Sequence, residues 1–140
     1  MSRRLLVCCA LVAGVACGGA GSDFPADASL DGVWTLRTVN HAALPYTLPQ
    51  SPNGFPTTIL GAILTISGTG SGSYNEVIAA RVVTPIRTID TSLTLSGTWS
   101  QNGASITFND KTFFEVYQGT VTNNTIVTFV LFGYSGEYSR

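Results

Sequence analysis

The chain has 140 residues with a formal net charge of −1 at pH 7, and only 11% of its residues are charged. This balance offers no basic surface for nucleic acid and no polybasic run for electrostatic docking to a membrane. The length suits one domain with a single core, and the three cysteines lie at positions 8, 9 and 17, so no disulfide is expected within that domain.

The first residues have the organisation of a secretory signal. Arg3 and Arg4 are followed by an apolar run from Leu5 to Val15 and by small residues before Cys17, which is the order of a signal peptide with its cleavage site. The apolar run is about eleven residues long, whereas a helix that spans a bilayer needs about 20. We therefore predict that residues 1–16 are a cleaved signal and not a transmembrane anchor.

The sequence Gly14-Val15-Ala16-Cys17 resembles the lipobox of bacterial lipoproteins. The resemblance implies cleavage before Cys17, diacylation of its side chain and acylation of the new amino terminus. The protein would then be held in the cell envelope by lipid, on the periplasmic or exterior side. Gly18 after the cysteine implies sorting to the outer membrane where a cell has two. Plain secretion after cleavage is the alternative.

The rest of the chain divides into a tether and one β-domain. Residues 17–31 are rich in Gly, Ala and Asp and show no periodicity, which predicts a flexible tether after the lipidated cysteine. From residue 32 to 140, runs of β-branched and aromatic residues alternate with short turns, and no helical periodicity interrupts them. The eight expected strands are Val33 to Val39, Thr58 to Ile66, Ser73 to Val83, Arg87 to Ser100, Ala104 to Phe108, Thr112 to Val121, Thr125 to Phe132 and Glu137 to Ser139.

The short links between these strands favour an all-β, antiparallel, up-and-down topology. Asn102-Gly103 is the strongest two-residue hairpin signal in the chain. Pairing the first strand with the last would close an eight-stranded barrel and remove both sheet edges. Such a barrel has an interior just wide enough for side chains or for one small ligand. A two-sheet sandwich remains open as an alternative.

Alternation of apolar and polar residues predicts which side chains face the core. Strands that are apolar on both faces, those expected over 112–121 and 125–132, leave their register open. For the other strands the expected inward residues are Leu60, Leu64, Ile66, Ile89, Leu93, Leu95, Trp99, Ile106 and Phe108.

Several phrases of the domain resemble one protein family. The first strand opens Gly32-Val33-Trp34, which is similar to the Gly-x-Trp that opens the first strand of lipocalins. The longer phrase from Gly32 to Pro49, with Tyr117 to Val121 and the ending Tyr138-Ser139-Arg140, resembles small bacterial lipoproteins with a lipocalin-like, calycin-type barrel. The resemblance implies that barrel over residues 32–140, with Trp34 plugging its closed base. It implies no catalytic signature.

The connection from Asn40 to Thr57 carries four prolines and is long for an ordered loop. In lipocalins the first loop between strands folds over the open end of the barrel. The resemblance therefore implies a lid, with Tyr46 and Phe55 lining the mouth. A loop that only covers the edge of the core is the alternative.

A few polar and aromatic side chains are candidates for contact with a ligand. Arg87 shares the inward phase of its strand, so it either holds an anionic head group or reaches water at the rim. Glu76 and Glu115 either pair with an arginine inside or face solvent, and we expect solvent. Trp99 is expected in the core or as a platform for a ligand.

Nothing in the sequence has the pattern of a catalytic or metal site. His41 is the single histidine, with no second imidazole or thiol for a metal and no nucleophile motif beside it. We therefore expect a monomeric, non-enzymatic binding module for a small apolar or amphipathic ligand, without metal or cofactor. Its expected ligand contacts are Arg87, Tyr46, Phe55 and Trp99. The alternative is a structural or interaction lipoprotein whose barrel is filled by side chains.

Overall fold

A computed structural model describes residues 29–51, 54–122, 124–130 and 133–140. The predicted signal, Cys17 and the first part of the predicted tether lie outside these residues. In the described segments the chain forms ten strands, and it contains no helix long and apolar enough to cross a bilayer. The strands are β1 Gly32–Val39, β2 Ala42–Ala43, β3 Tyr46–Thr47, β4 Thr57–Ser67, β5 Ser71–Val83, β6 Thr88–Asn102, β7 Ser105–Asp110, β8 Val116–Thr122, β9 Thr125–Val130 and β10 Tyr134–Ser139.

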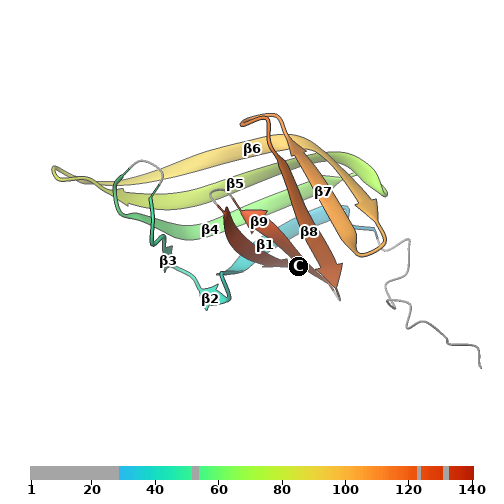
Figure 1. The fold of residues 1–140 in the computed structure, drawn as a ribbon, viewed down its shortest axis with the longest axis horizontal. Helices are drawn as coiled ribbons and strands as arrows, with labels where there is room; N and C mark the ends of the chain where they lie inside the picture. Colours follow the sequence, from blue (N-terminus) through green and yellow to red (C-terminus); the bar gives the residue numbers. More distant parts are fainter. Residues whose placement is uncertain (1–28, 52–53, 123, 131–132) are drawn as a thin grey trace, which may run out of the picture.

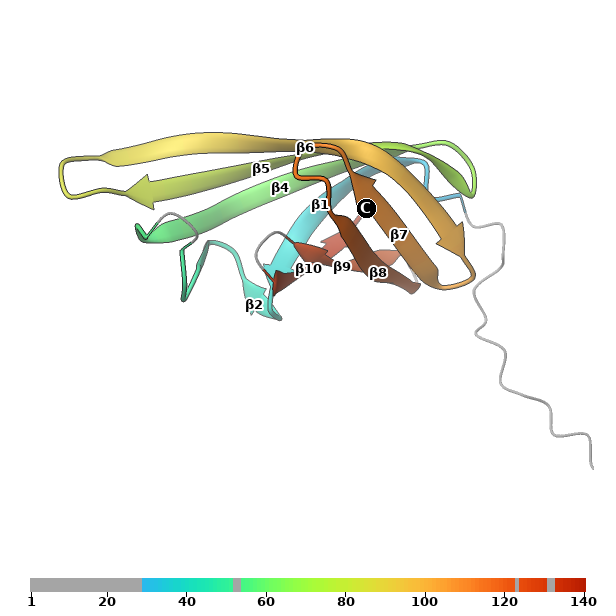
Figure 2. The same ribbon diagram turned by 45° about the horizontal axis from the view of Figure 1, so that its top comes forward.

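The sheet closes on itself. Strands β4 to β10 pair with their neighbours in chain order, all antiparallel, and β1 pairs with both β10 and β4. Of the strands described, these eight form the barrel in Figures 1 and 2, while β2 and β3 are short additions to its rim. The predicted up-and-down barrel is confirmed, the sandwich is excluded, and the topology is consistent with a calycin-like fold.

The strand expected from Thr112 begins four residues later, at Val116. The carboxylate of Asp110 accepts a hydrogen bond from the Phe113 N–H at 2.6 Å, and the Asp110 N–H donates to the Glu115 carbonyl at 2.8 Å. An aspartate that bonds the backbone ahead of it favours a turn over a strand. The predicted strand was therefore too long at its beginning, because residues 111–115 form this turn.

The inward faces follow the predicted alternation except at one position. Leu95, Trp99, Ile106 and Phe108 are all buried. In β4 the pairing with β5 shifts between Ile59 and Gly61, and an extra residue in one strand moves the following side chains to the other face. Ile59 is therefore buried in place of Leu60, whose predicted inward position was wrong.

One end of the barrel is filled by large side chains. Trp34 is 1% exposed, its indole N–H donates to the Leu30 carbonyl at 2.9 Å, and the Arg140 guanidinium lies 4.4 Å above its ring. Arg140 also donates to the carbonyls of Ser29 and Asp31. The first and last residues of the domain thus meet over Trp34 and close this end, which we call the base.

The β5–β6 hairpin is longer than the rest of the barrel and projects beyond it (Figures 1 and 2). Strands β5 and β6 pair along their whole length, from Ser71 with Ser100 to Val83 with Thr88. β7, in contrast, pairs only with the last part of β6, from Gly97 to Asn102. The first half of β6 therefore extends past its neighbour as an overhang.

Candidate functional site

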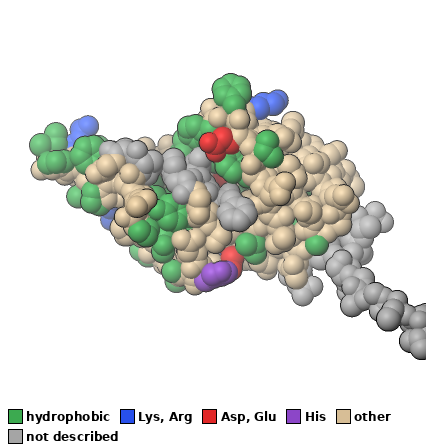
Figure 3. All heavy atoms as spheres, viewed as in Figure 1, with side chains coloured by type: hydrophobic (Ala, Val, Ile, Leu, Met, Phe, Trp, Pro, Cys, Tyr) green, Lys and Arg blue, Asp and Glu red, His purple; other side chains and the backbone are tan. Residues whose placement is uncertain are grey.

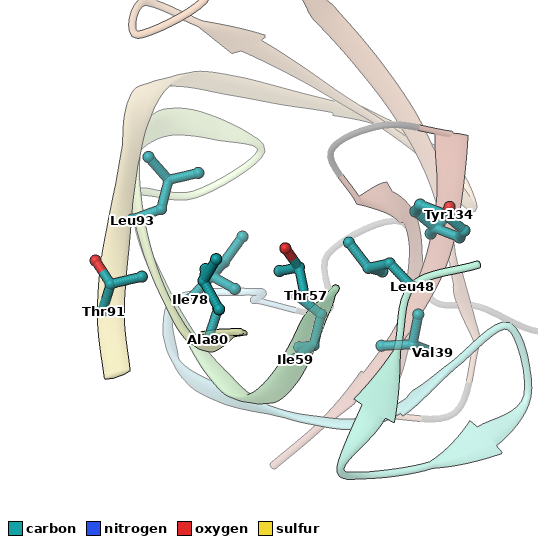
Figure 4. A pocket seen from close by; sticks show the side chains of 10 residues that line it. Val39, Leu48, Thr57, Ile59, Ile78, Ala80, Thr91, Leu93 and Tyr134 are labelled. Carbon is teal, nitrogen blue, oxygen red and sulfur yellow. The ribbon is translucent and has the colours of Figure 1, made fainter. Parts of the chain in front are cut away.

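A cavity of about 140 Å³ lies at the end of the barrel opposite the base, where the hairpin projects. Figure 4 shows the β5 and β6 side chains on one side of it, Val39, Leu48 and Tyr134 on the other, and Thr57 and Ile59 of β4 between them. All but three of the lining residues are aliphatic, and none is charged. The lining residues are Val39, Leu48, Thr57, Ile59, Ile78, Ala80, Val82, Thr91, Leu93 and Tyr134.

Two of the three polar side chains in the lining are engaged with the neighbouring loop. The Thr57 hydroxyl donates to the Phe55 carbonyl at 3.0 Å and lies 2.8 Å from the Ser51 hydroxyl. The Tyr134 hydroxyl donates to the Gln50 carbonyl at 3.0 Å. Their hydrogen-bonding capacity is largely used within the protein, so the cavity presents an apolar wall to an occupant.

The connection between residues 40 and 57 closes over part of the mouth. Its β2 pairs with β1 and its β3 with β4, and between β3 and β4 the Leu48 N–H donates to the Thr57 carbonyl at 2.8 Å. These bonds hold the buried Leu48 side chain in the wall of the cavity. The sequence analysis missed Leu48, although a leucine next to proline in a long loop was an available signal.

None of the four predicted contact residues lines the cavity. Tyr46 is half-buried and stacks edge-on against Tyr134, with ring centroids 6.3 Å apart. Trp99 is buried in the core, where its indole N–H donates to the Ser67 carbonyl at 3.0 Å. Phe55 is exposed beside the rim.

Arg87 lies at the far end of the hairpin, exposed, in a turn in which its N–H donates to the Thr84 hydroxyl at 3.1 Å. Arg87 precedes the first residue of β6, so its side chain lies in water beyond the barrel instead of on the inward face. The structure does not bring Arg87 to the cavity.

Below the cavity, the barrel contains a buried carboxyl group that the sequence analysis had assigned to solvent. Glu76 is 8% exposed and accepts a hydrogen bond from the Tyr138 hydroxyl. Burial raises the pKa of Glu76 to about 7, although the hydrogen bond from Tyr138 works in the other direction. Glu76 precedes the cavity-lining Ile78 by one inward position of β5. The prediction for Glu76 was wrong, while Glu115 is exposed as expected.

A second buried pair lies near the first. The Tyr74 hydroxyl donates to the Asp110 carboxylate at 2.8 Å, and burial together with this carboxylate raises the Tyr74 pKa. Asp110 and Glu76 each raise the pKa of Tyr74 through their charge. The interior is therefore acidic and aromatic below the cavity, and wholly uncharged within the cavity wall.

The candidate metal and catalytic groups are dispersed. In the part of the chain that the structure describes, no three His, Cys, Asp or Glu residues lie together as metal ligands. His41 is at the surface, with Nδ1 2.7 Å from the Glu137 carboxylate. Hydrogen bonds from Thr38 and His41 hold the pKa of Glu137 below its usual value.

Comparison with known proteins adds no assignment to this picture. No protein-family model matches the chain, and no curated protein or solved structure matches it either.

Proposed function

We propose that this protein is a non-enzymatic binding module that holds a small apolar group in the cavity at the open end of its barrel. The supporting observation is the uncharged, mainly aliphatic wall around about 140 Å³. An engineered apolar cavity of about 150 Å³ in another protein binds benzene, whereas pockets for whole drug-sized ligands have about 300–1,000 Å³. The ligand class is therefore a small hydrocarbon, or an amphipathic molecule that inserts only its apolar end.

Burial of hydrocarbon sets the expected affinity. Each methylene taken from water into the cavity contributes about 0.8 kcal/mol, which is about a fourfold gain in affinity. Calorimetric titration of the protein with straight-chain alcohols of increasing length tests this proposal. We expect saturable binding that tightens by about this factor per methylene and then reaches a plateau when the cavity is full. Absence of saturable binding across the series would contradict the proposal.

Two substitutions on β5 distinguish binding in the cavity from binding elsewhere on the surface. Ala80→Phe places a ring in the cavity wall, whereas Asn75→Phe adds the same ring to the exposed face of β5. We expect the first variant to lose alcohol binding and the second to keep it. Equal binding by the two variants would place the site elsewhere.

A second candidate function belongs to a different class. The base is filled by large side chains, among them Trp34, Trp99 and Phe108, so the barrel also suits a structural or interaction lipoprotein of the cell envelope. This candidate predicts that the cavity remains empty and that the outer surface carries the function. A protein that folds normally and binds no alcohol would favour it.

We further propose the setting that the lipobox resemblance implies, namely a lipid on Cys17 and a place in the cell envelope. The proposal rests on the sequence of residues 1–17 alone. In this setting the membrane is the first partner of the protein, and the ligand is the second.

A further inference from the structure

The overhanging half of β6 has an unpaired edge. At Ser96 the backbone N–H and carbonyl both point away from β5. The N–H donates to the Thr112 hydroxyl at 3.3 Å, and the carbonyl accepts from the Lys111 N–H at 2.9 Å. Backbone groups alternate in direction along a strand, so Thr88, Asp90, Ser92 and Thr94 also point away from β5. No described strand pairs with this edge.

This edge lacks the features that keep sheet edges from pairing. Native edges are protected by lysine, proline, bulges or inward charges, whereas between Thr88 and Leu95 the only charged residue is Asp90. The Asp90 carboxylate is bound by both Nε and Nη2 of Arg81, at 2.6 and 2.8 Å. An edge of Thr, Ser, Ile and Leu with its one charge already paired is suited to accept another strand.

We propose that a second copy of this chain pairs its β6 antiparallel with this edge, around a two-fold axis at Thr91. In this register Asp90 lies opposite Ser92 of the second copy and Thr88 opposite its Thr94, so the residues whose backbone groups face outward meet each other. Ile89 lies opposite the other Leu93, which gives apolar pairs on the inner face. Moving the axis to Asp90 would bring two like charges together, which is destabilising.

The same register covers the most exposed apolar side chains. Ile86 is 89% exposed at the far end of the hairpin, where Figure 3 shows hydrophobic side chains gathered. The register brings the turn that carries Ile86 toward Ser96 of the second copy, which binds the 111–115 segment that carries Phe113 and the 90% exposed Phe114. Arg87 of each copy also approaches Glu115 of the other copy. Both side chains are exposed, and their charges are opposite.

Pairing would also extend the cavity wall. Thr91 and Leu93 line the cavity from β6, and a second β6 alongside would continue that wall with its own Thr91 and Leu93. The dimer is inferred from the unpaired strand edge and the exposed apolar side chains, and not from the cavity. A failure of the cavity to bind a ligand would therefore leave the inference unchanged. The proposed dimer differs from the monomer expected from the sequence.

Disulfide trapping in the full chain tests the register. Two residues opposite each other at a site without hydrogen bonds have Cα atoms about 4.5 Å apart, within the range that a disulfide needs. We expect Thr91→Cys to form a covalent homodimer under mild oxidation. The control Thr98→Cys, exposed on the same strand but where β7 covers the edge, should form none. Both variants have the same other cysteines, encoded at positions 8, 9 and 17, so any cross-linking through those cysteines is equal in the two.

A second pair of variants tests the edge without a cross-link. The Ser92 N–H faces the open edge, so Ser92→Pro removes a donor that β5 does not use, while Ser92→Ala keeps it. Light scattering of the full chain in a mild non-ionic detergent should give a dimer for wild type and Ser92→Ala, and a monomer for Ser92→Pro. A monomeric wild type, equal cross-linking of the two cysteine variants, or a Thr91→Cys adduct with a different protein would each overturn the proposal.

Discussion

At the scale of single residues, Glu76 is the most unusual group in the barrel. It is a buried carboxyl near Tyr74 and Asp110 that accepts a hydrogen bond from the Tyr138 hydroxyl, and burial raises its pKa to about 7. A buried carboxyl that is neutral at moderate pH costs far less than a buried charge. The stability of the protein should therefore depend on whether this one proton is present.

We expect the free energy of unfolding to fall as the pH rises through the window between the two pKa values of Glu76. The unfolded chain releases this proton near pH 4.5 and the folded chain near pH 7, so the folded state binds more protons between them. The stabilisation is complete below pH 4.5 and is lost above about 7. Its size is on the order of 3 kcal/mol at 1.36 kcal/mol per unit.

Chemical denaturation at several pH values measures this dependence, and Glu76→Gln is the matched control. The amide cannot ionise, so the variant should lack the decline between pH 4.5 and 7 while keeping the contribution of every other group. The same slope in wild type and Glu76→Gln would show that another group is responsible.

At the scale of the strands, the core is closely packed where β6 lies between β5 and β7. A Cβ atom added to Gly97 would lie 2.0 Å from the Asn109 carbonyl oxygen and 2.9 Å from the Tyr74 ring, whereas one added to Gly61 meets nothing within 4 Å. We expect Gly97→Ala to lower the free energy of unfolding by about 1–3 kcal/mol, the usual cost of overpacking. Thermal unfolding compared with Gly61→Ala measures it, and equal losses in the two variants would refute this packing argument.

The strands also show how much of the fold can be predicted from the sequence. The β6 pattern, with Leu93, Leu95 and Trp99 in one phase, predicted both its length and its inward face. The bulge after Ile59 was not predictable, because a single extra residue leaves no mark in a run that is apolar on both phases. The turn expected at Asn109 and Asp110 was predicted too short because Phe113 and Phe114 favour a strand by propensity, while the Asp110 carboxylate bonded to the backbone extends the turn.

The candidate site was predictable only in its general location. The long connection after β1 correctly suggested the open end, since its Leu48 lines the cavity. The individual residues were not predictable, because the wall is assembled from strands far apart in sequence. Glu76 and Tyr138 are 62 positions apart, and no local pattern in β5 distinguishes an inward glutamate with a partner from an outward one in water.

At the scale of the whole molecule, the two ends of the barrel differ in character. The base is filled and lies where the chain enters the domain at Leu30 and Asp31, while the cavity opens at the far end under the hairpin. A lipid on Cys17 would therefore connect to the domain at its base, and the cavity opens at the opposite end of the barrel.

The attachment itself is testable in cells that make the full chain. We expect Cys17→Ser to shift the protein from the membrane fraction to the soluble fraction, because a serine cannot form the thioether to lipid. Fractionation and metabolic labelling with a radioactive fatty acid measure this, with Cys9→Ser as a control that keeps both label and membrane association. Membrane association of Cys17→Ser equal to that of wild type would contradict the lipid anchor.

The closure of the barrel by β1 and β10 has a consequence for the order of folding. β1 finds part of its pairing in β4, but its remaining edge and the Arg140 that covers Trp34 come from the last residues of the chain. The core is therefore incomplete until β10 has been synthesised, and pairing between β1 and β10 is slow because it joins distant positions. Until β10 has emerged, one edge of β1 stays unpaired and the barrel stays open.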